Sequence, residues 1–149
     1  MMYLGLLLAA GSAQAGTPGG PLGLGLGGGL GVSGISGKYH IGEIAIQGVI
    51  GGNNLAGDDT GVGVGVDYLL EMPDLGSSGN VDFAWNCGFG GTLGIGSSAT
   101  IGASGVVGFE ILVLAVPLDI VIEYRPGAEI LPDLTPDLFN FSSHVRYYF

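Results

Sequence analysis

Residues 61–72 read GVGVGVDYLLEM, and their side chains alternate in character with a period of two. Successive side chains of a β-strand point to opposite faces of a sheet. In a strand, one face of this segment would carry Val62, Val64, Val66, Tyr68, Leu70 and Met72. The opposite face would carry Gly61, Gly63, Gly65, Asp67, Leu69 and Glu71. The segment is therefore predicted to be a strand with one apolar face and one face of small and polar residues.

The same alternation continues on both sides of this segment. Seven other segments show it, at residues 22–27, 31–40, 41–51, 81–95, 98–112, 116–130 and 139–149. Turn-forming residues gather between many of them, at residues 27–29, 51–60, 73–79, 97–98 and 132–136. The longest of these expected loops covers residues 51–60. No stretch has a convincing helical period, so the sequence predicts an all-β fold with eight strands.

The composition, and the face on which the charges fall, indicate which face of these strands is outside and which is inside. The chain of 149 residues has 32 glycines, is 47% hydrophobic and only 11% charged, and has a formal net charge of −10. A soluble β-sandwich would place many charged residues on its outward face. Here the charges share a face with the glycines, and a purely apolar face recurs in every strand. This arrangement predicts a closed antiparallel eight-stranded transmembrane β-barrel with an apolar exterior and a side-chain-filled polar lumen.

Other classes of protein fit the sequence less well. Three basic residues are too few to neutralise nucleic-acid phosphates, so no nucleic-acid partner is expected. No apolar run approaches the about 20 residues of a transmembrane helix. A glycine-rich fibre is disfavoured because the segments differ from one another and end in distinct turns. The single cysteine, Cys87, falls on the apolar face, and no zinc motif is present, so we expect neither a metal nor a cofactor.

The N-terminal residues have the pattern of a secretory signal peptide. Residues 1–15 read MMYLGLLLAAGSAQA, an apolar stretch followed by the small-residue triplet Ala-Gln-Ala. Cleavage before Gly16 would leave residues 16–149 as a single barrel domain. The segment departs from the usual pattern because no Lys or Arg precedes the apolar stretch. The alternative is a short buried apolar strand.

The small-residue face carries most of the ionisable side chains, and buried charges must be paired. We therefore predict a lumenal charge network. Its expected members are Lys38, Asp67, Asp82, Glu110, Asp119, Glu123, Arg125, Glu129, His144 and Arg146. Glu43 shares their face on the same assignment. Acids outnumber bases, so the surplus acids should lie near the wet ends of the barrel, or their pKa values should be raised. Glu123 and Arg125 should contact the last strand through Arg146 or His144.

The C-terminal sequence HVRYYF ends in an aromatic residue. Alternating Phe141, Val145, Tyr147 and Phe149 resemble the signal by which bacterial outer-membrane β-barrels are recognised. Residues 34–39 (GISGKY), 116–127 (VPLDIVIEYRPG) and 146–149 (RYYF) resemble a group of small bacterial outer-membrane barrels of OmpA/OmpX-like size. His40 departs from the group's pattern, which usually has an aromatic residue there. The resemblance implies a bacterial outer-membrane location, contact with outer-membrane lipid, and assembly by the barrel-assembly machinery through the terminal strand.

Three functions remain open from the sequence. The first is a structural barrel that contributes to membrane integrity or surface contacts, and the second is a narrow acidic pore or small-ligand binding barrel. The third, a lipid-modifying enzyme, is disfavoured. Ser142 and His144 are two residues apart on one strand, about 7 Å, too far for a direct hydrogen bond. A dinucleotide-type glycine pattern at residues 23–28 has no helix after it, and the acidic pair Asp58-Asp59 lacks calcium-loop spacing.

Overall fold

The computed structural model describes residues 19–54 and 61–149. These residues form eleven β-strands and no α-helix. The strands are β1 (Leu22–Gly28), β2 (Val32–Ile41), β3 (Ile44–Asn53), β4 (Gly61–Glu71), β5 (Gly76–Ser78), β6 (Val81–Ile95), β7 (Ala99–Val113), β8 (Leu118–Tyr124), β9 (Gly127–Leu131), β10 (Thr135–Asp137) and β11 (Phe141–Tyr148). Within the described part of the chain, no helix is long and apolar enough to cross a bilayer.

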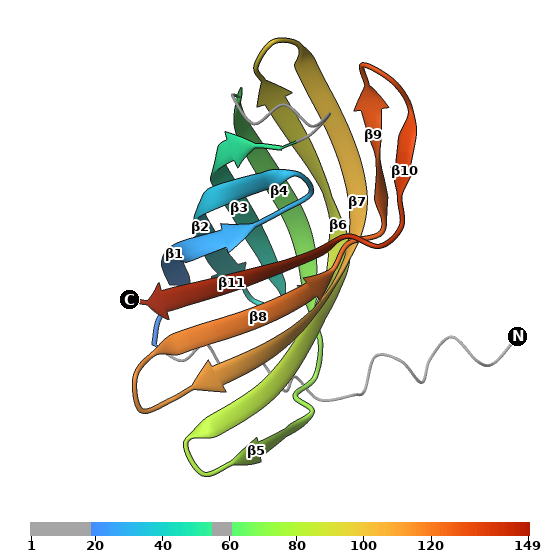
Figure 1. Cartoon of the computed structure of the whole chain (residues 1–149). Coiled ribbons are helices and arrows are strands. Elements are labelled where there is room, and N and C mark those ends of the chain that lie inside the picture. The colour runs from blue at the N-terminus through green and yellow to red at the C-terminus, as the bar shows by residue number, and fades with distance from the viewer. Residues whose placement is uncertain (1–18, 55–60) are drawn as a thin grey trace, which may run out of the picture.

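Eight of the described strands close into an antiparallel barrel (Figure 1). Their order around the wall is β1, β2, β3, β4, β6, β7, β8 and β11, and β11 pairs with β1 to complete the ring. Closure leaves no edge among these eight strands, so the backbone groups of the wall pair with one another. The predicted all-β, closed, eight-stranded antiparallel barrel is confirmed.

Glycines make the β1–β11 seam possible. Each inward position of β1 is a glycine, and each faces a large inward side chain of β11. The pairs are Gly23 with Tyr148, Gly25 with Arg146 and Gly27 with His144. A Cβ on Gly25 would overlap the carbonyl oxygen of Val145 and lie 2.8 Å from the Cα of Arg146. A Cβ on Gly23 or Gly27 would instead overlap the Tyr148 or His144 ring, so β1 leaves room for both the backbone and the side chains of β11.

The two faces of the wall have opposite character. Outward positions carry exposed apolar side chains on every barrel strand, with exposed fractions of 69% at Leu26, 67% at Phe89 and 66% at Phe141. Inward positions are buried and mostly small or polar, and the one apolar cluster among the described residues is Ala45, Leu69 and Val106. Cys87 lies on the outward-facing parity and is partly buried. The molecule therefore has its apolar surface outside and its charges inside.

The segment 116–130, predicted as one strand, is divided at Pro126, which has no N–H to donate to a ladder. Both parts, β8 and β9, pair with β7 in one register, Tyr124 with Val107 and Gly127 with Ser104. Their other edges differ, because β8 pairs with β11 and β9 pairs with β10. The predicted turn at residues 132–136 is confirmed only at 132–134, and it connects β9 with β10, not the two barrel strands. The resulting β9–β10 hairpin stands beyond the start of β11 (Figure 1).

A second short strand, β5, lies within the predicted turn at residues 73–79 and pairs with the first residues of β6. The longest connection between barrel strands in the described part of the chain covers residues 125–140, so the prediction that residues 51–60 form the longest loop is wrong. The expected signal peptide, residues 1–15, lies outside the described residues. The same holds for Asp58 and Asp59.

Candidate functional site: the polar network inside the barrel

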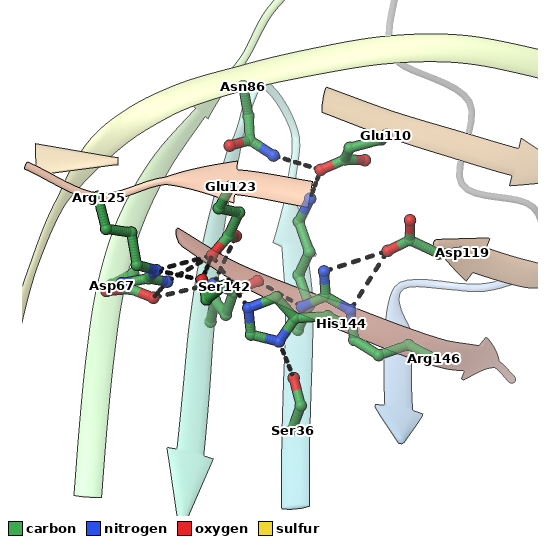
Figure 2. A network of polar contacts seen from close by, with 12 residues as sticks. Ser36, Asp67, Asn86, Glu110, Asp119, Glu123, Arg125, Ser142, His144 and Arg146 are labelled. Carbon is green, nitrogen blue, oxygen red and sulfur yellow. Dashed lines mark hydrogen bonds and ion pairs between the residues drawn. The ribbon is translucent and has the colours of Figure 1, made fainter. Parts of the chain in front are cut away.

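Three buried basic side chains organise the interior. Lys38 on β2, Arg125 directly after β8 and Arg146 on β11 are each at most 1% exposed. Five carboxylates lie beside them, Asp67, Glu71, Glu110, Asp119 and Glu123. Figure 2 shows most of this network, which extends across the lumen between strands distant in the sequence. A charge at such a buried position is tolerated only with an ionic or hydrogen-bonding partner.

Arg125 has the most complete set of partners. Its Nη1 donates to Asp67 Oδ1 at 3.0 Å and its Nη2 to Asp67 Oδ2 at 2.5 Å, a bidentate pair. Its Nη2 also lies 2.7 Å from Glu123 Oε2, and its Nε donates to Ser142 Oγ at 2.8 Å. The guanidinium therefore connects β4, β8 and β11 through charge-assisted bonds.

Lys38 is the centre of a second cluster, toward the end of the barrel that holds both Leu22 and Tyr148. Its Nζ lies 2.7 Å from Glu71 Oε1 and forms a second ion pair with Glu110 Oε1. Asn86 donates its side-chain N–H to the same Glu110 oxygen. One ammonium therefore holds carboxylates from β4 and β7 together.

Arg146 lies between these two clusters. Its Nε donates to Asp119 Oδ2 at 3.2 Å, and its Nη1 donates to the side-chain carbonyl of Gln47. Gln47 Nε2 in turn donates to Asp67 Oδ2 and to Glu123 Oε1, both at 2.9 Å. One buried amide thus links the Arg146 pair with the Arg125 cluster into a single network.

His144 completes a hydrogen-bonded chain of serine, histidine and carboxylate. Its Nδ1 lies 2.8 Å from Ser36 Oγ and its Nε2 lies 3.0 Å from Glu123 Oε2. The same Glu123 oxygen accepts from Ser142 Oγ at 2.9 Å, so Ser142 and His144 meet through a shared carboxylate and not directly. A nucleophile must be within reach of substrate, and Ser36 is fully buried. Glu123 therefore contacts both the His144 ring and the Arg125 guanidinium.

Negative charge is in excess inside the barrel. Three bases and five acids give the described interior a formal charge of −2 when His144 is neutral. Within the described residues, Glu71 Oε2 and Asp119 Oδ1 are buried without a hydrogen-bond partner. Tyr148 donates to Asp119 Oδ2 at 3.4 Å, and its hydroxyl lies 3.0 Å from His40 Nε2. The surplus is one acid beside Arg125 and one acid beside Lys38, because Asp119 balances Arg146.

Most of the predicted network members meet in this one network, and three predicted acids lie elsewhere. Glu43 is exposed in the β2–β3 turn. Asp82 is half-buried at the start of β6 beside β5, where burial and the Asp82 charge raise the pKa of Asp74. Glu129 is half-buried on β9, at the opposite end. The interior assignment of Glu43 is wrong because the chain turns there.

Sequence reasoning did not assign several polar residues to the network. They are Ser36, His40, Gln47, Glu71, Asn86, Ser142 and Tyr148. Most of them are neutral, so a search for charged side chains passes over them. Inward parity is the signal that could have found five of them, Ser36, His40, Glu71, Ser142 and Tyr148, because each shares a face with a network residue on its own strand. Gln47 and Asn86 lie on strands that carry no charge of the network.

The predicted assembly-signal residues lie on the other face of the wall. Phe141, Val145 and Tyr147 point outward along β11, and Phe149 follows the strand, where its N–H donates to the Leu22 carbonyl at 3.0 Å. Tyr147 and Phe149 make an edge-on ring contact with centroids 5.0 Å apart. The C-terminal strand therefore presents an apolar, partly aromatic row outside and four polar network members inside, Ser142, His144, Arg146 and Tyr148.

The described residues contain no group of three or more histidine, cysteine or acidic side chains arranged to hold a metal ion. The fold and the site together define a closed eight-stranded β-barrel whose lumen is filled by salt-bridged polar side chains. Comparison of the chain with protein-family models, with curated proteins and with solved structures gives no match.

Proposed function

We propose that the chain is a structural β-barrel of the bacterial outer membrane that contributes to membrane integrity or to surface contacts. The observation that carries this proposal is the inversion of the molecule, with apolar side chains exposed on all eight barrel strands and charges buried inside. In water such a continuous apolar surface would lead to association. In a bilayer the same surface is solvated by lipid chains, and ring closure satisfies the wall's backbone groups.

The C-terminal strand supports assembly by the barrel-assembly machinery as the proposed partner. Its row of Phe141, Val145, Tyr147 and Phe149 is exposed, as a signal read by another protein must be. Outer-membrane lipid is the other proposed partner. A purely structural role needs neither cofactor nor catalysis, and the proposal includes neither.

The acid surplus in the lumen favours one alternative, a narrow pore selective for cations. Against a pore, eight strands enclose only enough space for side chains, and the network extends across that space. Conductance of the refolded full chain in a planar bilayer separates the two functions. The structural role predicts no stepwise conductance under an applied potential, whereas reproducible cation-selective steps would replace it with the pore.

A further inference from the structure

A cavity lies at the rim of the barrel, at the end away from the C-terminus. Its volume is about 890 Å³, within the usual range for small-molecule sites. It lies between the β1–β2 hairpin, the short strand β10 and the first half of β11. Figure 1 shows this hairpin beside β11 and the β9–β10 hairpin beyond the start of β11.

This cavity connects the lumen with the outer surface of the barrel. Its lining includes alternate residues of β11, the inward Ser142 and His144 together with the outward Phe141 and Val145. Such a lining is possible at the rim of the barrel, beyond the last β1–β11 pair, Gly27 with His144. Strand β1 stops at Gly28, and β10 has no partner on its second edge among the described residues.

The polar side of the cavity accepts hydrogen bonds and is negatively charged. Within the described residues its lining contains no Lys or Arg, but it contains the acids Glu129 and Asp137. The side-chain oxygen of Asn140, also in the lining, is buried without a hydrogen-bond partner. These groups favour a ligand that carries positive charge and N–H donors.

The positive charge of Arg125, which lies behind the cavity, does not cancel the preference for a cationic ligand. Arg125 lies directly behind the lining, where its Nε donates to Ser142 Oγ at 2.8 Å. Its charge is already shared between Asp67 and Glu123. The region thus has one base against two acids behind the lining and two more acids within it.

The outer side of the cavity is apolar. Leu26, Phe141 and Val145 line it and are exposed by 69%, 66% and 48%. We infer that this cavity binds the ammonium head of an amphiphile, whose hydrocarbon tail lies outside the barrel along these three side chains. A lipid tail reaches that surface only from a bilayer or a micelle, so the inference rests on the proposed membrane location.

Paramagnetic broadening of backbone amides tests this inference on the full chain refolded in neutral-detergent micelles. Three nitroxide-bearing dodecyl amphiphiles are compared, with a quaternary ammonium, a neutral and a phosphate head. A fourth probe is a nitroxide-bearing trimethylammonium without a tail. For the ammonium amphiphile we expect at least threefold stronger broadening at residues 27–31 and 140–144 than for the neutral one. The turn at Gly42 and Glu43, at the other end of the barrel, should not discriminate between them.

Charge-neutralising variants identify the recognition groups. The double variant Glu129→Gln/Asp137→Asn should reduce the broadening by the ammonium amphiphile to the level of the neutral one. The matched control Glu43→Gln removes one exposed acid at the opposite end and should leave it unchanged. Equal broadening by all three amphiphiles, or an unaffected double variant, would overturn the inference. Equal broadening by the tailless cation would assign the site to a free amine and also contradict the amphiphile.

The test of this cavity and the test of the proposed function can fail independently. Failure of membrane insertion would appear as a barrel that does not contact lipid, whatever the amphiphiles do in micelles. Failure of the cavity site alone would leave insertion and the absence of conductance intact.

Discussion

Replacing Arg125 by methionine should destabilise the barrel severely. The methionine side chain keeps much of the apolar volume of arginine but donates no hydrogen bond. Asp67 would lose its bidentate partner and Glu123 would lose its ion pair, and both carboxylates would stay buried. Removing one partner of a buried ion pair costs about 3–5 kcal/mol. Because a typical domain has about 5–15 kcal/mol of stability, this loss is a large share of the total.

The free energy of unfolding can be measured by urea titration of the refolded protein in lipid vesicles. The intrinsic fluorescence of Trp85, the single tryptophan, reports the transition. The matched control is Glu43→Gln, which changes an exposed charge in a turn and should alter stability by no more than about 0.5 kcal/mol. Both variants should keep the wild-type dependence of stability on urea concentration.

A second substitution tests whether the cost comes from unpaired charge. Adding Asp67→Asn to Arg125→Met removes one of the two stranded carboxylates. The double variant should be more stable than the sum of the two single losses predicts, by about 1–3 kcal/mol. A loss below about 1 kcal/mol for Arg125→Met, or strict additivity of the two substitutions, would refute the role assigned to this network.

Two further predictions concern the seam and the C-terminus. Gly25→Ala should destabilise the barrel by about 1–3 kcal/mol, because its Cβ would overlap the backbone of β11; Gly28→Ala, whose nearest contact is 3.5 Å away, should be nearly neutral. Urea titration of both variants checks this, and equal losses would contradict the steric explanation. Deletion of Phe149 should reduce the amount of heat-modifiable barrel in bacterial outer membranes, whereas Phe139→Ala should not. Normal membrane insertion of the truncated chain would argue against an assembly signal at this end.

Most of the fold prediction rests on the period-two alternation of apolar and polar residues. In β4 it places Asp67 inward and Tyr68 outward, and in β8 it places Glu123 and Arg125 on the inward face, as the structure shows. A shift of one residue would turn every side chain of a strand to the other face of the wall. In a closed barrel with an apolar outside and a polar inside, such a shift is strongly disfavoured. The alternation therefore predicts which residues enter the lumen.

The partners within the lumen do not follow from parity. Lys38 pairs with Glu110, 72 residues away, because the stagger of strands around the closed ring brings them to one level. A single sequence contains no direct signal for that stagger. Gln47 was missed for a different reason, since an uncharged amide on a weakly alternating strand gives no sign that it bridges two charge clusters.

The two short strands outside the ring were missed because their sequences are poor strand formers. The Gly-Ser-Ser segment of β5 has low strand propensity, but β6 extends beyond the end of β4 and leaves an edge that β5 covers. Strand β10 contains Pro136, which is tolerated because β10 is an edge strand. In both cases pairing with a neighbouring strand, and not local strand propensity, determines the structure.

Quenching of Trp85 by brominated lipids is the most direct test of the inverted barrel. This side chain has outward parity on β6, opposite Phe109 on β7. In vesicles of lipids brominated on their acyl chains, the refolded protein should lose most of its fluorescence, while aqueous iodide should have little effect. A control with Trp85→Phe and Leu134→Trp moves the probe to the exposed β9–β10 turn, where iodide and not bromine should quench. Fluorescence of Trp85 that is insensitive to bromine and quenched by iodide would contradict a barrel whose apolar exterior faces lipid.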